Sequence, residues 1–233
     1  MPKFRLFTFK EAMLQRIVPS FLPVRSIVAA FVFSLVLPVS GLFGQDLKKG
    51  ESFFQVCVAC HGPEGLGNPL LNAPAIAGLD IPYVETQLHN FKHGIRGADA
   101  RDSAGLQMRP MSMTLQDEQA IKDVAAFVGT LKPKVPNDTL HGGDIAKGEA
   151  TYALCLACHG PDAAGNPLLK SPSLQYQSDW YMLRQLKKFK EGIRGSNPQD
   201  IGGMQMRPMS MTLADEQAMK DVIAYIRSIS PKE

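Results

Sequence analysis

The sequence has little of several residue types that would indicate other classes of protein. It contains four cysteines and one tryptophan among 233 residues, and it has no low-complexity tract and no long block of one charge. After residue 44, basic and acidic residues nearly balance at 20 and 21. A nucleic-acid-binding protein needs a basic surface, so this balance argues against that class. The alternation of apolar and polar residues that marks β-strands is also missing, which favours an all-α fold.

Residues 1–44 have the composition of an export element. Five basic residues and one acidic residue precede an uncharged stretch whose apolar centre reads IVAAFVFSLVLPV, and Gly41 and Gly44 offer small residues for cleavage. This pattern predicts a cleaved signal peptide. Because the uncharged stretch approaches the ~20 residues that span a bilayer, a retained membrane anchor is the alternative. In both cases the body of the protein is expected outside the cytoplasm, soluble in the periplasm or anchored to the cytoplasmic membrane.

The rest of the chain is a tandem repeat with an offset of 98 residues. Residues 50–133 align without gaps on residues 148–231, and FKHGIRG faces FKEGIRG. The nonapeptide QMRPMSMTL occurs at 107–115 and again, unchanged, at 205–213. Each repeat is long enough to form a small domain. We therefore predict two domains, 46–134 and 144–233, joined by a linker at 135–143 that is rich in turn-forming residues.

Three helices are predicted in each repeat, with loops between them that include the Met-rich nonapeptides. The first helix leads into the cysteines, and the second spans PYVETQLHNFKHG or DWYMLRQLKKFKEG. The last is predicted to begin at Thr114 and Thr212, where Thr followed three residues later by Asp resembles a capping box. Its apolar residues recur at i, i+3, i+4 and i+7, which predicts one buried face: Ile121, Val124, Ala125 and Val128, and Met219, Val222, Ile223 and Ile226.

All four cysteines belong to two Cys-x-x-Cys-His motifs, the attachment signature of c-type haem. The two thiols add to the two vinyl groups of one porphyrin, and the histidine that follows is then placed under the iron. A redox dithiol or a zinc site is the alternative, but neither explains a histidine after both motifs. We therefore predict two covalently bound haem c groups, attached and ligated by Cys57, Cys60 and His61, and by Cys155, Cys158 and His159.

The Met-rich nonapeptides can supply the sixth ligand of each haem iron. A methionine in this position raises the reduction potential of the iron. Met108 follows His61 by 47 positions, and Met206 follows His159 by the same interval. From the residues alone, one methionine of each nonapeptide is predicted as the ligand, and Met111, Met113, Met209 and Met211 remain alternatives.

Residues 46–232 resemble the two-haem cytochrome c4 family, which consists of tandem class I cytochrome c domains. The resemblance rests on both Cys-x-x-Cys-His motifs, the Met-rich stretches and the L-x-D-E…A-[FY] pattern of the last helix. It implies that the iron-bound methionine lies seven residues before the Leu that opens the last helix, which selects Met108 and Met206. It also implies that the carbonyl of Pro74 or Pro172 accepts the N–H of the proximal imidazole.

Further side chains are candidates for the haem propionates. The resemblance assigns Tyr83 and Tyr181 to them, and Arg96 and Arg194 are candidates because of their charge, as are Arg109 and Arg207. A solvated surface charge is the alternative for each arginine. His89, His93 and His141 have no counterpart in the other repeat, which indicates surface histidines. Ligation of one iron by His89 or His93 is an alternative.

A haem iron with both axial positions filled cannot bind oxygen, peroxide or a substrate without losing a ligand. The prediction is therefore an electron carrier and not an enzyme. The resemblance implies that the haems face each other across the domain interface through their propionate edges. The expected role is to carry electrons in a bacterial respiratory chain, from a quinol-oxidising complex or periplasmic dehydrogenase to a terminal oxidase. The alternatives are a subunit fixed in a larger membrane-bound complex, or a dihaem peroxidase or sulfur-compound oxidase.

Overall fold

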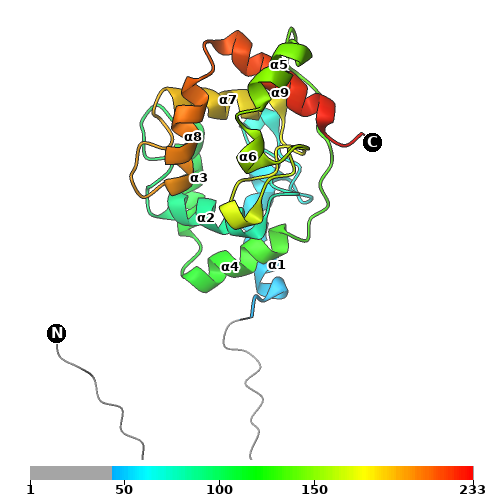
Figure 1. The fold of residues 1–233 in the computed structure, drawn as a ribbon. Helices are drawn as coiled ribbons and strands as arrows, with labels where there is room; N and C mark the ends of the chain where they lie inside the picture. Colours follow the sequence, from blue (N-terminus) through cyan, green and yellow to red (C-terminus); the bar gives the residue numbers. More distant parts are fainter. Residues whose placement is uncertain (1–43, 233) are drawn as a thin grey trace, which may run out of the picture. The chain divides into compact units, whose positions relative to one another are not determined.

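The computed structural model describes residues 44–232, which form helices and no strand (Figure 1). The all-α prediction is therefore confirmed. The predicted export element at 1–44 lies outside the described residues, apart from Gly44. No helix within 44–232 is both long and apolar enough to cross a membrane.

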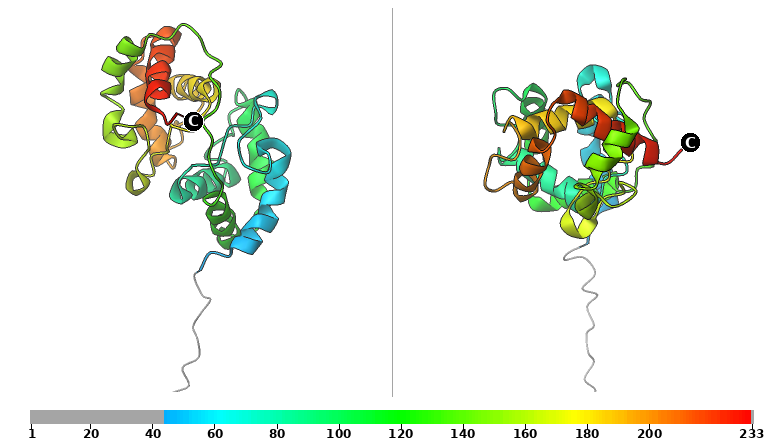
Figure 2. Two further views of the ribbon diagram at one scale, coloured as in Figure 1. Left: turned by 90° about the vertical axis from the view of Figure 1, so that its right-hand side faces the viewer. Right: turned by 45° about the horizontal axis from the view of Figure 1, so that its top comes forward.

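Each repeat forms its own set of helices, in the same order. The first contributes α1 (Leu47–His61), η1 (Pro69–Leu71), α2 (Ile81–Lys92), α3 (Ser103–Met113) and α4 (Glu118–Val128). The second contributes α5 (Ile145–Tyr152), α6 (Leu156–His159), η2 (Pro167–Leu169), α7 (Asp179–Lys190), α8 (Ile201–Met211) and α9 (Glu216–Ile229). In Figure 2 the two sets are separated by their colours, and α2 of the first set contacts η2 of the second.

The core of each repeat is a pair of helices, α1 with α4 and α5 with α9 (Figure 1). A glycine lies at each crossing. A Cβ atom on Gly50 would lie 2.1 Å from the carbonyl oxygen of Asp123, and one on Gly148 would lie 2.0 Å from that of Asp221. Only glycine allows the two backbones to approach this closely.

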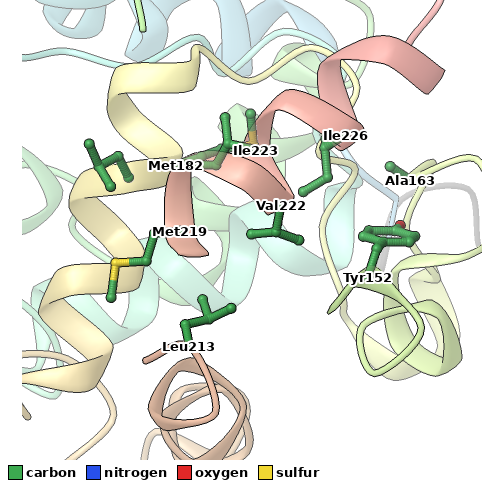
Figure 3. Close-up of a cluster of buried hydrophobic side chains, with 9 residues drawn as sticks. Tyr152, Ala163, Met182, Leu213, Met219, Val222, Ile223 and Ile226 are labelled. Atoms are coloured by element: carbon green, nitrogen blue, oxygen red, sulfur yellow. The ribbon is translucent and has the colours of Figure 1, made fainter. Parts of the chain in front are cut away.

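The last helix buries the face that its periodicity predicts. Ile121, Val124, Ala125 and Val128 are at most 2 % exposed, and their counterparts in α9 are at most 5 % exposed. Figure 3 shows the α9 residues among the other side chains of the second core, Tyr152, Ala163, Met182 and Leu213. Each repeat therefore has a separate hydrophobic core.

The predicted start of the last helix is wrong by four residues. Thr114 and Thr212 are the C-cap residues of the preceding helices, and α4 and α9 begin at Glu118 and Glu216. The N-cap is the aspartate of the TLQD or TLAD sequence. The Asp117 carboxylate accepts a hydrogen bond from the Ala120 N–H at 2.8 Å, as Asp215 does from Ala218 at 2.9 Å. Aspartate is as good an N-cap as threonine, and here its extended backbone decides the boundary.

The Met-rich nonapeptides lie mostly in helices, where a loop was predicted. Asp102 caps α3 by accepting a hydrogen bond from the Gly105 N–H at 2.8 Å, and Asp200 caps α8 in the same way at 3.0 Å. Pro110 lies inside α3 and Pro208 inside α8. Gln, Met and Arg, which favour helix, precede the proline in both stretches, and together with the caps they outweigh the helix-breaking signal.

The first predicted helix is continuous in one repeat and interrupted in the other. α1 runs unbroken to His61, but the chain between α5 and α6 forms tighter turns. There the Leu154 N–H donates to Thr151 O at 3.2 Å, and the Cys155 N–H donates to Tyr152 O at 2.8 Å. These bonds span three residues, as in a 3₁₀ turn. In both repeats the helical segment ends at the histidine of the motif.

Candidate haem sites

The two motif histidines have the same position and the same hydrogen bond. His61 ends α1 and His159 ends α6, and each is 6 % exposed. His61 Nδ1 donates to the carbonyl oxygen of Pro74 at 2.9 Å, and His159 Nδ1 donates to that of Pro172 at 3.0 Å. Because a carbonyl oxygen can only accept, Nδ1 carries the proton. The lone pair of Nε2 is then available to a metal, and the ring is held in one orientation.

Burial favours the neutral form of both imidazoles. It lowers the pKa of His61 and of His159, and the hydrogen bond to the proline carbonyl offsets only part of this effect. A neutral imidazole is the form that binds iron. The environment of both residues therefore suits a proximal ligand.

Two of the four cysteines, Cys57 and Cys155, are poorly placed for redox chemistry. Burial, with a smaller effect from Cys60, raises the pKa of Cys57 to about 11, and burial also raises the pKa of Cys155. A reactive dithiol needs the opposite shift. Within residues 44–232, no group of three or more potential metal ligands includes a cysteine. This geometry does not support the zinc alternative.

Met108 and Met206 are the most buried methionines of their nonapeptides. Both are half-buried, whereas Met111 and Met209 are each 39 % exposed and Met113 and Met211 are about 60 % exposed. All six lie on α3 or α8. Their burial agrees with the choice of Met108 and Met206 as ligands, although the ligand role itself stays a prediction.

The predicted propionate residues lie together where the two repeats meet. Arg96 donates from Nη2 to the hydroxyl of Tyr181 at 3.0 Å, and Arg194 donates from Nη2 to the hydroxyl of Tyr83 at 3.1 Å. Each arginine therefore contacts the tyrosine of the other repeat. Because the residues are equivalent by the 98-residue offset, the contact is nearly symmetric, as at an isologous interface.

Two glutamines complete this network, and sequence reasoning missed them. Gln87 Oε1 accepts from Arg96 Nη1 at 2.7 Å and from Arg194 Nη2 at 3.0 Å. Gln185 Oε1 accepts from Arg194 Nη1 at 2.8 Å and from Arg96 Nη2 at 3.2 Å. Gln87 and Gln185 are the same residue type 98 positions apart, on equivalent helices, and this match was the signal that the sequence offered. We name these six residues the Arg–Tyr–Gln network: Tyr83, Gln87, Arg96, Tyr181, Gln185 and Arg194.

Burial does not remove the positive charge of Arg96. Burial acts to lower the pKa of Arg96, but Tyr181 and Tyr83 outweigh it and the pKa is raised. Burial acts to raise the pKa of Tyr181, but Arg96 and Arg194 outweigh it and the pKa is lowered. The Nε atoms of both arginines are buried and have no partner among the described residues. Two buried guanidinium groups with free N–H donors fit the carboxylates of haem propionates.

The remaining candidates lie in three different settings. Arg109 and Arg207 also have a buried Nε without a partner among residues 44–232, and their guanidinium groups lie against Gly94 and Gly192. These arginines are therefore not simple solvated charges. His141 is exposed, as predicted for a surface histidine. His89 and His93 lie beside Glu118.

Sequence reasoning also missed a buried ion pair between the repeats. Lys188 of α7 binds the carboxylate of Asp102, the N-cap of α3, and their side chains are only 12 % and 3 % exposed. In the reciprocal position, Asn90 Nδ2 donates to Asp200 Oδ1 at 3.3 Å. The two aspartates match by the offset, but the lysine and asparagine differ, so the repeat alone did not reveal the pair.

Comparisons with known proteins identify the family. The family model for cytochrome c matches the chain twice, at residues 47–132 and 145–230. Cytochrome c4 of Thiocapsa roseopersicina is 34 % identical over 198 residues, which cover 79 % of this chain and 93 % of that protein. The thiosulfate dehydrogenase electron acceptor of Thiomonas intermedia is 34 % identical over 178 residues, which cover 72 % of this chain and 77 % of that protein.

A solved structure gives the same result for the fold. Reduced recombinant cytochrome c4 from Pseudomonas stutzeri superimposes with a TM-score of 0.61 at 27 % identity, over 79 % of this chain and 98 % of that one. Each matched domain here contains one Cys-x-x-Cys haem-binding motif, Cys57/Cys60 or Cys155/Cys158. The chain thus belongs to the cytochrome c family, as a two-domain electron carrier of the cytochrome c4 type with two covalently bound haem c groups.

Proposed function

We propose that this protein is a periplasmic electron shuttle of a bacterial respiratory chain. It carries single electrons from a quinol-oxidising complex or a periplasmic dehydrogenase to a terminal oxidase. Haem c, when bound, supplies one-electron oxidation and reduction at its iron. The observation that carries the proposal is the equivalence of the two sites. Each has a buried histidine held by a proline carbonyl and a half-buried methionine at the same interval.

The chain's own residues give each site its properties. The carbonyls of Pro74 and Pro172 hold the proximal rings and make them better ligands. With haem bound, Met108 and Met206 would be the residues to complete the iron's ligand set, which would exclude small molecules and raise the potential. The Arg–Tyr–Gln network places donors for the propionates at the domain interface. Two sites that are both closed in this way favour a carrier over a peroxidase.

One relative favours a dehydrogenase as the electron donor. The Thiomonas intermedia protein is named as the electron acceptor of thiosulfate dehydrogenase. An acceptor receives electrons from an enzyme, so this similarity supports the carrier role and points to a sulfur-compound dehydrogenase among the donors. To test this, the oxidised protein is mixed either with thiosulfate dehydrogenase and thiosulfate or with a quinol-oxidising complex and quinol. The donor that reduces the haem faster at equal enzyme concentration is the preferred one.

The closed sites can be tested with carbon monoxide. The absorption spectrum of the reduced wild type is expected to stay unchanged when the gas is added. Met108→Ala and Met206→Ala should each allow about half of the haem to bind it, because each opens one of two sites. Met113→Ala and Met211→Ala, at the more exposed positions, are the matched controls and should behave as the wild type. Binding by half of the wild-type haem would overturn the proposal in favour of a dihaem enzyme.

The location of the protein needs a separate experiment. A cleaved, free shuttle is released with the periplasmic fraction, and its N-terminus lies near residue 45. A protein that stays with the membranes after a salt wash would instead be anchored, or fixed as a subunit in a larger complex. N-terminal sequencing of the purified protein then distinguishes an anchored chain from a subunit held by a larger complex, because only an anchored chain retains the apolar segment.

A further inference from the structure

A second group of potential metal ligands lies on the first domain, separate from the haem-attachment motifs. His89 is on α2, His93 directly follows this helix, and Glu118 is the first residue of α4. One ligand atom of each residue lies within 4.8 Å of those of the other two. Among the described residues, no other three His, Cys, Asp or Glu side chains come as close together. His93 and Glu118 are exposed and His89 is half-buried, so a cation in solution can reach them.

The two histidines are arranged to act together. They are four residues apart, which places them on one face of the helix and matches the His-x-x-x-His spacing of many zinc sites. Their ring centroids are 4.1 Å apart. His93 Nδ1 donates to the carbonyl oxygen of His89 at 3.0 Å, so the proton is on Nδ1 and the lone pair is on Nε2. A second-shell hydrogen bond of this kind orients a metal ligand before the metal binds.

The second domain has a different set of residues at the position of this cluster. The residues equivalent to His89, His93 and Glu118 are Lys187, Glu191 and Glu216. Lys187 Nζ lies 2.5 Å from Glu216 Oε2, so an ammonium group joins α7 to the start of α9. The first domain keeps the carboxylate but has imidazole in place of the ammonium group. A cation between the helices would therefore have to come from solution.

We propose that His89, His93 and Glu118 bind one Zn²⁺ ion, which joins the C-terminal end of α2 to the start of α4. Two imidazoles and one carboxylate suit Zn²⁺ and its transition-metal neighbours better than Mg²⁺ or Ca²⁺, which prefer oxygen ligands alone. Three protein ligands leave the fourth tetrahedral position to water. The bound ion takes the place that the Lys187 ammonium group has in the second domain. This site does not depend on the electron route proposed above.

The stoichiometry of zinc binding tests the proposal directly. Purified holoprotein is dialysed against ZnCl₂ in a non-chelating buffer, and zinc and iron are then measured together. The two haem irons are an internal standard, so the wild type should contain one zinc for every two irons. The double variant His89→Lys/His93→Glu copies the residues of the second domain, which fold in that setting. It should keep its haem spectrum and melting temperature but lose the zinc, with an affinity for Zn²⁺ in calorimetry at least ~10-fold lower.

Two further variants provide the controls. His141→Gln removes the other exposed histidine of the described chain and should leave one zinc for every two irons. Lys187→His/Glu191→His transfers the cluster to the second domain and should raise the content to two zinc ions. Equal zinc in the wild type and the double variant, or loss of zinc in His141→Gln, would overturn the proposal. A transferred cluster that binds no additional zinc would overturn the claim that these three residues suffice.

Discussion

The two domains share a fold and a haem motif, but they meet each other with different charges. On one side of the interface, the Lys188 ammonium group pairs with the buried Asp102 carboxylate. On the other side, Asn90 gives the equivalent Asp200 carboxylate a hydrogen bond of 3.3 Å from an uncharged amide, and Asp200 Oδ2 is buried without a partner among the described residues. The six residues of the Arg–Tyr–Gln network are alike in both halves, whereas the partners of Asp102 and Asp200, Lys188 and Asn90, differ.

A surface turn shows the same divergence. Arg101 Nη2 lies 2.6 Å from Asp99 Oδ2 in the first domain, and Asn197 and Gln199 replace this pair in the second. The backbone of the turn is the same. The Arg101 N–H donates to the Asp99 side chain at 2.9 Å, and the Gln199 N–H donates to the Asn197 side chain at 2.9 Å. The local fold therefore needs the side-chain oxygen and not the charge.

The largest effect is expected from breaking the buried ion pair. Lys188→Ala leaves the Asp102 carboxylate buried without its cation, which should lower the free energy of unfolding by about 3 kcal/mol or more. Asn90→Ala is the matched control and removes a hydrogen bond from an uncharged donor to a carboxylate, worth about 1.5 kcal/mol. Denaturant unfolding of both variants, followed by haem absorbance, measures the difference. Equal losses would show that the charge at position 188 contributes nothing to the contrast between the two sides.

The helix crossings should respond equally in both domains. Gly50→Ala and Gly148→Ala each place a methyl group about 2 Å from a backbone carbonyl oxygen of the partner helix. Because the backbone cannot move away cheaply, each substitution should lower stability by about 1–3 kcal/mol. Gly202→Ala, where a Cβ atom meets nothing within 4 Å, is the control and should have little effect. Losses that differ strongly between Gly50→Ala and Gly148→Ala would contradict the equivalence of the two cores.

The repeat and its periodicities predicted most of the fold. The cysteine motifs, the buried face of the last helix and the absence of strands all depend on local patterns, which a sequence displays directly. The hydrogen bonds from His61 to Pro74 and from His159 to Pro172 also match the expectation from the resemblance. The helical state of the Met-rich stretch was not predicted. Asp102, whose side chain caps this helix, lies outside that stretch.

Contacts between the domains could not be predicted because they depend on how the two repeats are placed together. Nothing local distinguishes Gln87 from any other polar residue on a helix surface. Only the partner domain turns it into an acceptor for two arginines. The pairing of Lys188 with Asp102 spans 86 positions in the sequence and has no symmetric copy. The clue that was available, identity at the 98-residue offset, identifies Asp102 and Asp200 but not their partners.

The asymmetric interface can be made symmetric with one substitution. Asn90→Lys should place an ammonium group beside Asp200, whose second oxygen lacks a partner within residues 44–232. The expected gain in the free energy of unfolding is about 1 kcal/mol, because burying the lysine offsets much of the attraction. Burial lowers the pKa of Lys188 even beside its carboxylate, so this offset exists in the protein. A loss of stability in Asn90→Lys would mean that the second side does not have the shape of the first.

The smallest effect is expected at the surface turn, and it can be measured as a titration. The hydrogen bonds from Arg101 lower the pKa of the Asp99 carboxyl from 3.8 to about 2. Because the folded-state pKa is the lower one, the contribution of this group to stability is present above pH 3.8 and is lost as the pH falls through 2. Following the Asp99 carboxyl by NMR should give a midpoint near 2 in the wild type. In Arg101→Gln, which copies the second domain, the midpoint should return toward 3.8.

The pair is solvent-exposed, so the change in overall stability should be small. A midpoint that Arg101→Gln does not move would show that the backbone N–H alone holds the carboxylate, and the charges of this turn would then make no difference between the domains.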